Sequence, residues 1–268
     1  LKIRSLMEKK ILYLLTCVGL CWSSCTNEVD EFIGNVEPST RSVSTALNAN
    51  LASLFTGGAP TLTSAEIKEV NDAYAKMTSI NCYRNIDEAV RNKTSYAGTI
   101  FLDDTYASAY FRKGSLAFPP YGILASSMEH EFIHMYQRDV QGKKVDTDKE
   151  KRDTGMMEFE LAFYQGIIRY IHAGYSWTFK GEDGDPSYQS LWTSGLTDPS
   201  LIPQYEREFQ TYVASICANG KPTSIDINEF VKWSNIFGEY SRGYSGKGYK
   251  FGNYDYGTSC INSLLKLY

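Results

Sequence analysis

The sequence predicts an α+β fold, and two observations support this prediction. Residues 99–118 contain two or three short stretches, TIFLDD, YASAYF and SLAF, whose β-branched and aromatic content is typical of strands. On either side of them, apolar residues recur at spacings of three and four, which indicates helices. The chain has 268 residues, of which 43% are hydrophobic and 22% charged, so it is long enough to bury a sizeable core.

The first 24 residues are expected to form a secretory signal peptide and not part of the fold. Four basic residues precede or adjoin the apolar run Ile11–Trp22, which is too short to span a bilayer. The run ends in Ser23-Ser24-Cys25, which resembles a bacterial lipoprotein processing site. In this interpretation Cys25 carries a lipid anchor, and the protein is exported and held in the bacterial cell envelope, at the outer membrane, on its periplasmic or surface face. An ordinary signal peptide that is cut nearby is the alternative.

Composition separates the rest of the chain into a tether and one domain. Residues 25–45 are polar and acidic and predict a flexible tether, and residues 46–268 are expected to form a single domain. The net charge of −4 argues against a dedicated nucleic-acid binder, which would carry a basic surplus. It also argues against attachment to an anionic membrane by charge, so that a lipid anchor would have to supply membrane attachment. Three cysteines remain beyond Cys25, and they allow at most one disulfide without indicating the pair: Cys82, Cys217 and Cys260.

A helix is predicted from Ser64 to Met77, with Ser64 as its cap and Glu66 in its first turn. The strands of residues 99–118 follow, and Pro119-Pro120 ends the last of them, because proline cannot donate to a ladder. A second helix is then expected over residues 121–140.

The second half of the chain is predicted to be mostly helical. Residues 141–155 are almost entirely polar and indicate a solvated loop, with Asp153 or Thr154 capping a helix over residues 156–172. Two further helices are expected near residues 202–218 and 225–237. Residues 238–257 hold six glycines and five tyrosines without a fixed repeat, and we expect a loop-rich lobe there.

The pentapeptide His130-Glu131-Phe132-Ile133-His134 carries the chemistry. It holds two of only three histidines, spaced as H-E-x-x-H within the helix expected over residues 121–140. Positions i and i+4 lie one turn apart on one helix face, so both imidazoles can reach a single ion at about 2.0–2.1 Å. Glu131 is angled toward a water on that ion instead of toward the ion itself.

A peptidase-type zinc site needs a third protein ligand and an open fourth position. The metzincin continuation H-x-x-G-x-x-H is excluded, because Gln137 replaces its glycine and Val140 its last histidine. His172, the remaining histidine, ends an apolar helix, where the helix dipole favours it without any metal.

Glu158 and Glu160 are the better candidates for the third ligand. They lie on different faces of the helix over residues 156–172. Glu160 falls within a bulky apolar stripe, where a carboxylate is costly unless it is paired or metal-bound. Either glutamate would also be favoured near a helix N-terminus without a metal. The properties of the residues therefore do not decide which of the two glutamates is the third ligand.

The two segments together resemble a known group of enzymes. H-E-F-I-H at 130–134 followed by E-F-E-L-A at 158–162 resembles the gluzincin group of zinc metallopeptidases, in which a glutamate on a later helix completes the site. The second segment is similar to the E-[FY]-x-A-D element of the membrane prenyl-protein proteases, whose first glutamate binds zinc and matches Glu158. Alanine comes one residue later here, at Ala162, which keeps Glu160 as the alternative.

The stretch HEFIHMYQ also looks like the H-E-x-x-H-x-Y-Q segments of secreted or lipoprotein zincins. These resemblances imply a zincin-like fold, with a small twisted sheet over an active-site helix and a mostly helical second lobe. They imply a zinc metallopeptidase in which His130, His134 and Glu158 hold zinc and Glu131 is the general base that hydrolyses a protein or peptide substrate. The SLAF strand would then be an edge strand able to bind an extended peptide.

A second donor for the oxyanion could come from the Gly- and Tyr-rich lobe, for example Tyr240, Arg242 or Tyr244, although such tyrosines are more often packing residues. Two alternatives belong to other classes. The first is a non-catalytic envelope lipoprotein that binds a protein or glycan on a zincin scaffold. The second is a structural metal with four protein ligands, including His172 or a cysteine.

Overall fold

The computed structural model describes residues 46–143, 151–172, 196–218, 220–241 and 258–268. The predicted signal peptide, the Cys25 anchor and the tether lie outside these residues. The helices and strands follow in this order: α2 (Ala49–Leu54), α3 (Ser64–Ser79), α4 (Asn81–Lys93), β1 (Ile100–Leu102), β2 (Tyr110–Arg112), β3 (Ser115–Phe118), α5 (Ala125–Met135), η2 (Tyr136–Val140), α6 (Lys151–His172), η5 (Pro199–Leu201), α7 (Ile202–Ile216), β4 (Cys217–Ala218), β5 (Lys221–Pro222), α8 (Ile227–Tyr240) and α9 (Ser259–Leu265).

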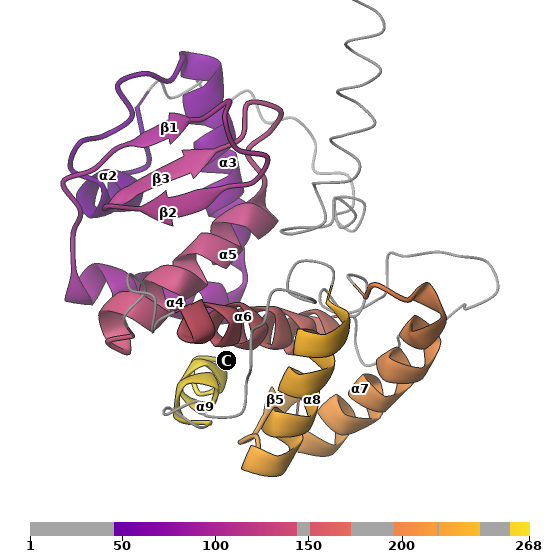
Figure 1. Ribbon diagram of the computed structural model, residues 1–268. Helices are drawn as coiled ribbons and strands as arrows, with labels where there is room; N and C mark the ends of the chain where they lie inside the picture. Colours follow the sequence, from indigo (N-terminus) through magenta and orange to yellow (C-terminus); the bar gives the residue numbers. More distant parts are fainter. Residues whose placement is uncertain (1–45, 144–150, 173–195, 219, 242–257) are drawn as a thin grey trace, which may run out of the picture.

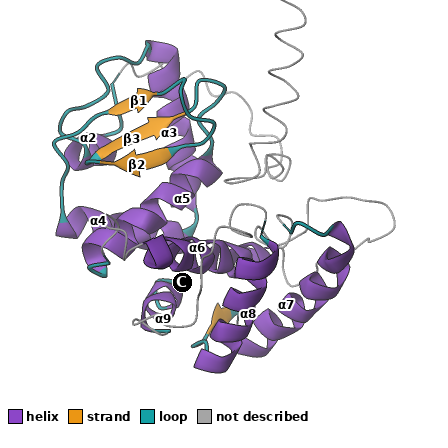
Figure 2. Cartoon of the chain, viewed as in Figure 1, coloured by secondary structure: helices purple, strands orange, loops and turns teal. Residues whose placement is uncertain are grey.

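The elements form two groups that α6 joins (Figure 1). Helices α3, α4 and α5 pack against one another, and α5 also contacts the edge of the small sheet. Helix α6 contacts α5 on one side and α7, α8 and α9 on the other. Figure 2 shows that helix predominates over strand throughout the described chain, so the predicted α+β class is confirmed in a mostly helical form. No helix in the described part of the chain is long and apolar enough to cross a membrane.

The sheet has three strands in the order β1-β3-β2. β1 runs parallel to β3, and β2 runs antiparallel to it. The expectation that SLAF is an edge strand is therefore wrong, because β3 is central. The turn Lys113-Gly114, where both residues have positive φ (51° and 79°), folds β2 back along one side of β3, and β1 pairs in parallel with the other side. β2 is therefore an edge strand, and it contacts α5.

Most predicted helices are present, with shifted ends. Helix α3 begins with a capping box in which the Thr63 N–H donates to the Glu66 carboxylate (2.6 Å) and the Glu66 N–H donates to the Thr63 hydroxyl (3.3 Å). The cap is thus Thr63 and not Ser64. Helix α6 begins at Lys151, so the predicted caps Asp153 and Thr154 lie inside the helix.

Further differences concern the ends of three predicted segments. The helix predicted over 121–140 begins at Ala125 and ends in a π-helical turn, in which the Gln141 N–H donates to the Tyr136 carbonyl (3.0 Å). Helix α8 extends to Tyr240, past the predicted end at 237, and the Gly- and Tyr-rich residues 242–257 lie outside the described chain. Helix α4 had not been expected at all.

An aromatic core holds α6 against the helices of the second half. Phe159 packs edge to face against Phe230 of α8, and Phe163 packs in the same way against Phe209 of α7, with ring centroids 5.2 Å apart in both pairs. All of these rings are buried. Because α6 also contacts α5, this packing fixes one wall of the site described below. Cys82, Cys217 and Cys260 are free thiols, so no disulfide forms among them.

Candidate metal centre

Three side chains from two helices converge at one point. His130 and His134 of α5 bring their Nε2 atoms to 3.1 Å from each other. Glu158 of α6 places one carboxylate oxygen 3.4 Å from Nε2 of His130 and the other 3.2 Å from Nε2 of His134. Their potential ligand atoms all lie within 4.8 Å of one another, and in the described part of the chain no fourth His, Cys, Asp or Glu joins this group.

The fold explains why these side chains meet. Helical spacing places His130 and His134 on one face of α5, and their rings lie edge to face with centroids 4.7 Å apart. The apolar residues between and beside them, Met128, Phe132 and Ile133, are fully buried and anchor α5 against the core. The side chains of His134 and Glu158 remain 18% and 20% exposed. The group is therefore set in the core but reachable from solvent.

The spacing of the donor atoms fits a single metal ion. Ligands about 2.0–2.1 Å from a tetrahedral zinc lie about 3.3–3.4 Å from one another. The two Nε2 atoms are 3.1 Å apart, and each lies within 3.4 Å of one of the two carboxylate oxygens of Glu158, so the separations are close to those of ligands that share one ion. Two imidazoles and one carboxylate are also a donor set that zinc accepts, and with three protein ligands a fourth position stays open.

The pKa shifts of the two histidines also show that the group attracts a positive charge. Burial lowers the pKa of His130 to about 4, because the charged imidazolium loses its hydration, and Glu158 offsets this only in part. Burial acts on His134 too, but the carboxylates of Glu158 and Glu131 and a hydrogen bond with Gln137 outweigh it and raise the pKa to about 9. Without a metal, the carboxylates therefore keep a proton on His134. A metal cation at the same place would meet the same attraction from these carboxylates.

Glu131 lies beside this group without belonging to it. Its side chain is buried, and burial raises the pKa of its carboxyl to about 7. The backbone of Phe111 in edge strand β2, which contacts α5, acts on the pKa of this carboxyl in the opposite direction. A carboxyl group whose pKa lies near neutrality can both accept and release a proton at that pH.

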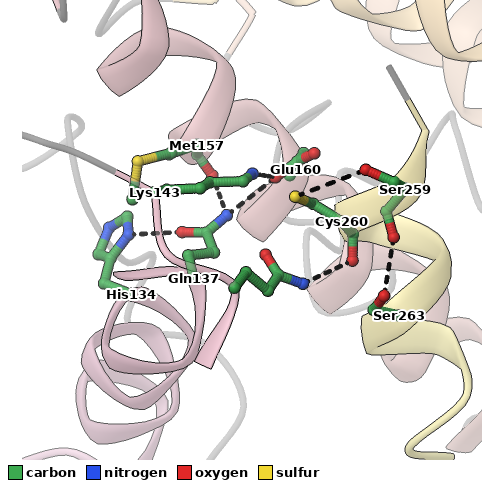
Figure 3. A network of polar contacts seen from close by, with 9 residues as sticks. His134, Gln137, Lys143, Met157, Glu160, Ser259, Cys260 and Ser263 are labelled. Carbon is green, nitrogen blue, oxygen red and sulfur yellow. Dashed lines mark hydrogen bonds and ion pairs between the residues drawn. The ribbon is translucent and has the colours of Figure 1, made fainter. Parts of the chain in front are cut away.

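Glu160, the alternative third ligand, has a different partner. Its carboxylate pairs with the ammonium group of Lys143 in the fully buried interior (Figure 3). Lys143 thereby stabilises the charge of Glu160, whose neighbours on α6 are apolar. The structure therefore brings Glu158 to the two histidines and directs Glu160 elsewhere.

The remaining candidates do not join the described group. His172 is the last residue of α6, as expected, and its side chain lies outside the described structure. Tyr240 ends α8, and Arg242 and Tyr244 fall outside the described residues. No cysteine is a member of the metal group among the described residues, which does not favour the closed structural site.

Gln137 and Lys143 are the contacts that sequence reasoning missed. Gln137 stands in the stretch HEFIHMYQ, three residues after His134, and this spacing is a usable signal for a side chain that reaches the same helix face. Lys143 begins a polar stretch that resembles any solvated loop, and its burial could not be read from the sequence. No family model, curated protein or solved structure matches this chain.

Proposed function

We propose that the protein is a zinc-dependent metallopeptidase of the zincin type, with His130, His134 and Glu158 as zinc ligands and Glu131 as the general base. One observation carries the proposal: an H-E-x-x-H helix and a glutamate from a second helix bring two imidazoles and one carboxylate together, with potential ligand atoms within 4.8 Å of one another. The buried Glu131 carboxyl beside them adds a proton acceptor of suitable pKa.

Zinc bound there would lower the pKa of a coordinated water toward about 7 and polarise the scissile carbonyl. Glu131 accepts the proton of the attacking water and delivers it to the leaving amine. Burial of Glu131 disfavours its charge, so the carboxyl takes up that proton readily.

The edge strand supports a peptide as the substrate class. β2 lies at the border of the sheet and contacts α5, the helix that carries Glu131. An extended main chain that runs along β2 would therefore pass close to the general base. Main-chain pairing of this kind gives affinity with little sequence preference, which suits hydrolysis of unfolded segments.

The experiment combines metal content with hydrolysis of an unfolded protein such as casein. The purified protein is expected to contain one zinc per chain and to cleave casein, with a chelator stopping cleavage and added zinc restoring it. Glu131→Gln should retain zinc and lose hydrolysis. If Glu131→Gln cleaves at the wild-type rate, the mechanism is wrong. If zinc binds but casein, an unfolded protein pool and a peptide library all remain intact, the non-catalytic binding lipoprotein takes its place.

We also propose that the protein is exported and anchored in the cell envelope through a lipid on Cys25, with residues 25–45 as the tether. The support is the signal-like segment that ends in Ser23-Ser24-Cys25. Metabolic labelling with a fatty-acid analogue tests this proposal. The full chain should take up the label and fractionate with membranes, whereas Cys25→Ala should do neither. Equal labelling of both forms would contradict the anchor.

A further inference from the structure

A buried chain of polar contacts lies behind His134 (Figure 3). Nδ1 of His134 is 2.9 Å from Oε1 of Gln137. The Gln137 amide nitrogen donates to the Met157 carbonyl (3.0 Å) and to a carboxylate oxygen of Glu160 (3.2 Å). The same oxygen of Glu160 pairs with Lys143. Gln137 and Glu160 are both fully buried, so these contacts are shielded from water.

The two acceptors around the Gln137 amide nitrogen decide which way the amide faces. A nitrogen placed toward His134 would leave its oxygen against the Met157 carbonyl and the Glu160 carboxylate, and those contacts repel. Oε1 therefore faces His134, and Nδ1 must donate to it. With the Nδ1 proton held in this bond, Nε2 is the nitrogen left to bind a metal at the point where Glu158 and His130 converge.

The ion pair explains why the amide keeps this orientation. Lys143 supplies a positive charge that stabilises the Glu160 carboxylate in the interior, so the acceptor for the Gln137 amide stays in place. Lys143 is also tied to Gln137 directly, because its backbone N–H donates to the Gln137 carbonyl (3.1 Å). Gln137 lies in the π-helical turn that follows α5, three residues after His134 and on the same side of the helix.

We propose that Gln137 is a positioning residue of the metal centre, which the buried Glu160–Lys143 pair holds in place, and that it fixes the Nδ1–H tautomer and the ring orientation of His134. The inference rests on the proposed metal site and deepens it. A hydrogen bond from a ligating imidazole to a fixed acceptor orients the ring and raises its basicity. Glu160 thus serves the site through Gln137 and not as a ligand.

Gln137→Leu tests the inference, with Gln141→Leu as its matched control. Gln141 lies one turn further along, and its amide donates to the Cys260 carbonyl (2.8 Å), so the control also removes a glutamine hydrogen bond between packed elements. Zinc affinity is measured by competition with a chromophoric chelator. We expect Gln137→Leu to bind zinc about 10–100-fold more weakly than the wild type, and Gln141→Leu to match the wild type.

Three results are distinguishable. Wild-type protein that binds no zinc overturns the proposed function itself. If the wild type binds zinc and Gln137→Leu binds it with the same affinity, only the positioning role of Gln137 is wrong. An equal loss of zinc affinity in Gln137→Leu and Gln141→Leu also overturns that role, because the loss would then come from a general destabilisation of the fold.

A measurement on the wild type does not depend on how the variants fold. In the zinc-loaded protein, nitrogen-15 NMR of the imidazoles is expected to show His134 coordinated through Nε2, with an Nδ1–H that exchanges slowly and shows an NOE to the Gln137 side chain. Coordination through Nδ1, or an Nδ1–H in fast exchange with water, would overturn the inference.

Discussion

A carboxylate oxygen of Glu158 lies 3.2 Å from Nε2 of His134, although the two residues belong to different helices. The contact depends on the packing of α6 against α5, and that packing depends in turn on the aromatic contacts that α6 makes with α7 and α8. The position of Glu158 is thus a tertiary property, whereas the spacing of His130 and His134 follows from one helix alone.

The first prediction concerns the two imidazoles of the metal-free protein. NMR titration should give a pKa of about 9 for His134 and about 4 for His130. Burial disfavours both charged forms, but the Glu158 carboxylate stabilises the imidazolium of His134 more strongly. Glu158→Gln should therefore lower the pKa of His134. A pKa for His134 that is the same with and without the Glu158 charge would contradict this electrostatic account.

The same pair makes stability depend on pH. The folded-state pKa of His134 lies above the ordinary value of 6.5, so its contribution is fully present below about pH 6.5 and is lost as the pH rises through about 9. Denaturant unfolding of the metal-free wild type and of Glu158→Gln should therefore differ more at pH 6 than at pH 10. If the difference in unfolding free energy between the two proteins is the same at both pH values, Glu158 and His134 do not form the proposed ion pair.

The second prediction concerns the buried ion pair. Lys143→Met leaves the Glu160 carboxylate in the interior without its cation, and we expect it to cost about 3–5 kcal/mol of unfolding free energy. Replacement of both partners, in Lys143→Met/Glu160→Leu, should cost less than Lys143→Met alone, because no buried charge is left behind. Chemical denaturation of the wild type, Lys143→Met, Glu160→Leu and the double variant measures the cycle. Additive costs would show that the two side chains do not interact.

The third prediction concerns the close approach of two glycines at the sheet. A Cβ added to Gly98 would lie 2.2 Å from the Gly114 carbonyl oxygen and 2.5 Å from its carbonyl carbon, both of them backbone atoms. Gly98→Ala must therefore displace the β2–β3 turn, and we expect a loss of about 1–3 kcal/mol. Thermal unfolding measures it, and an unchanged midpoint would mean that the turn does not pack on Gly98 as described.

Local features of the site and fold could be predicted from the sequence. The H-E-x-x-H spacing, the helix that begins at Ser64 and the strand content of residues 99–118 depend on neighbours in the chain, so their patterns predicted them. Helix α4 also carried a signal, because Cys82, Ile86 and Val90 are buried at spacings of four, but only Ile80 separates it from α3. Two helices joined this closely offered no turn signal between them.

Features set by distant residues could not be predicted. The choice between Glu158 and Glu160 depends on Lys143, whose polar surroundings in the sequence indicate a solvated loop while the structure buries it. The central place of SLAF in the sheet depends on β1, which pairs in parallel with β3 although β2 lies between them in the sequence. In both cases a contact with another segment of the chain decides the outcome.

The central claim is tested most directly by measuring zinc content. The wild type, Glu158→Ala and Glu160→Ala are loaded with a modest excess of zinc, desalted and compared. The account predicts one zinc per chain in the wild type, zinc that is retained but bound more weakly in Glu160→Ala because Gln137 loses a partner, and a loss of zinc in Glu158→Ala. Zinc retained by Glu158→Ala but lost by Glu160→Ala, or no zinc in the wild type, would contradict the assignment of His130, His134 and Glu158 as the metal centre.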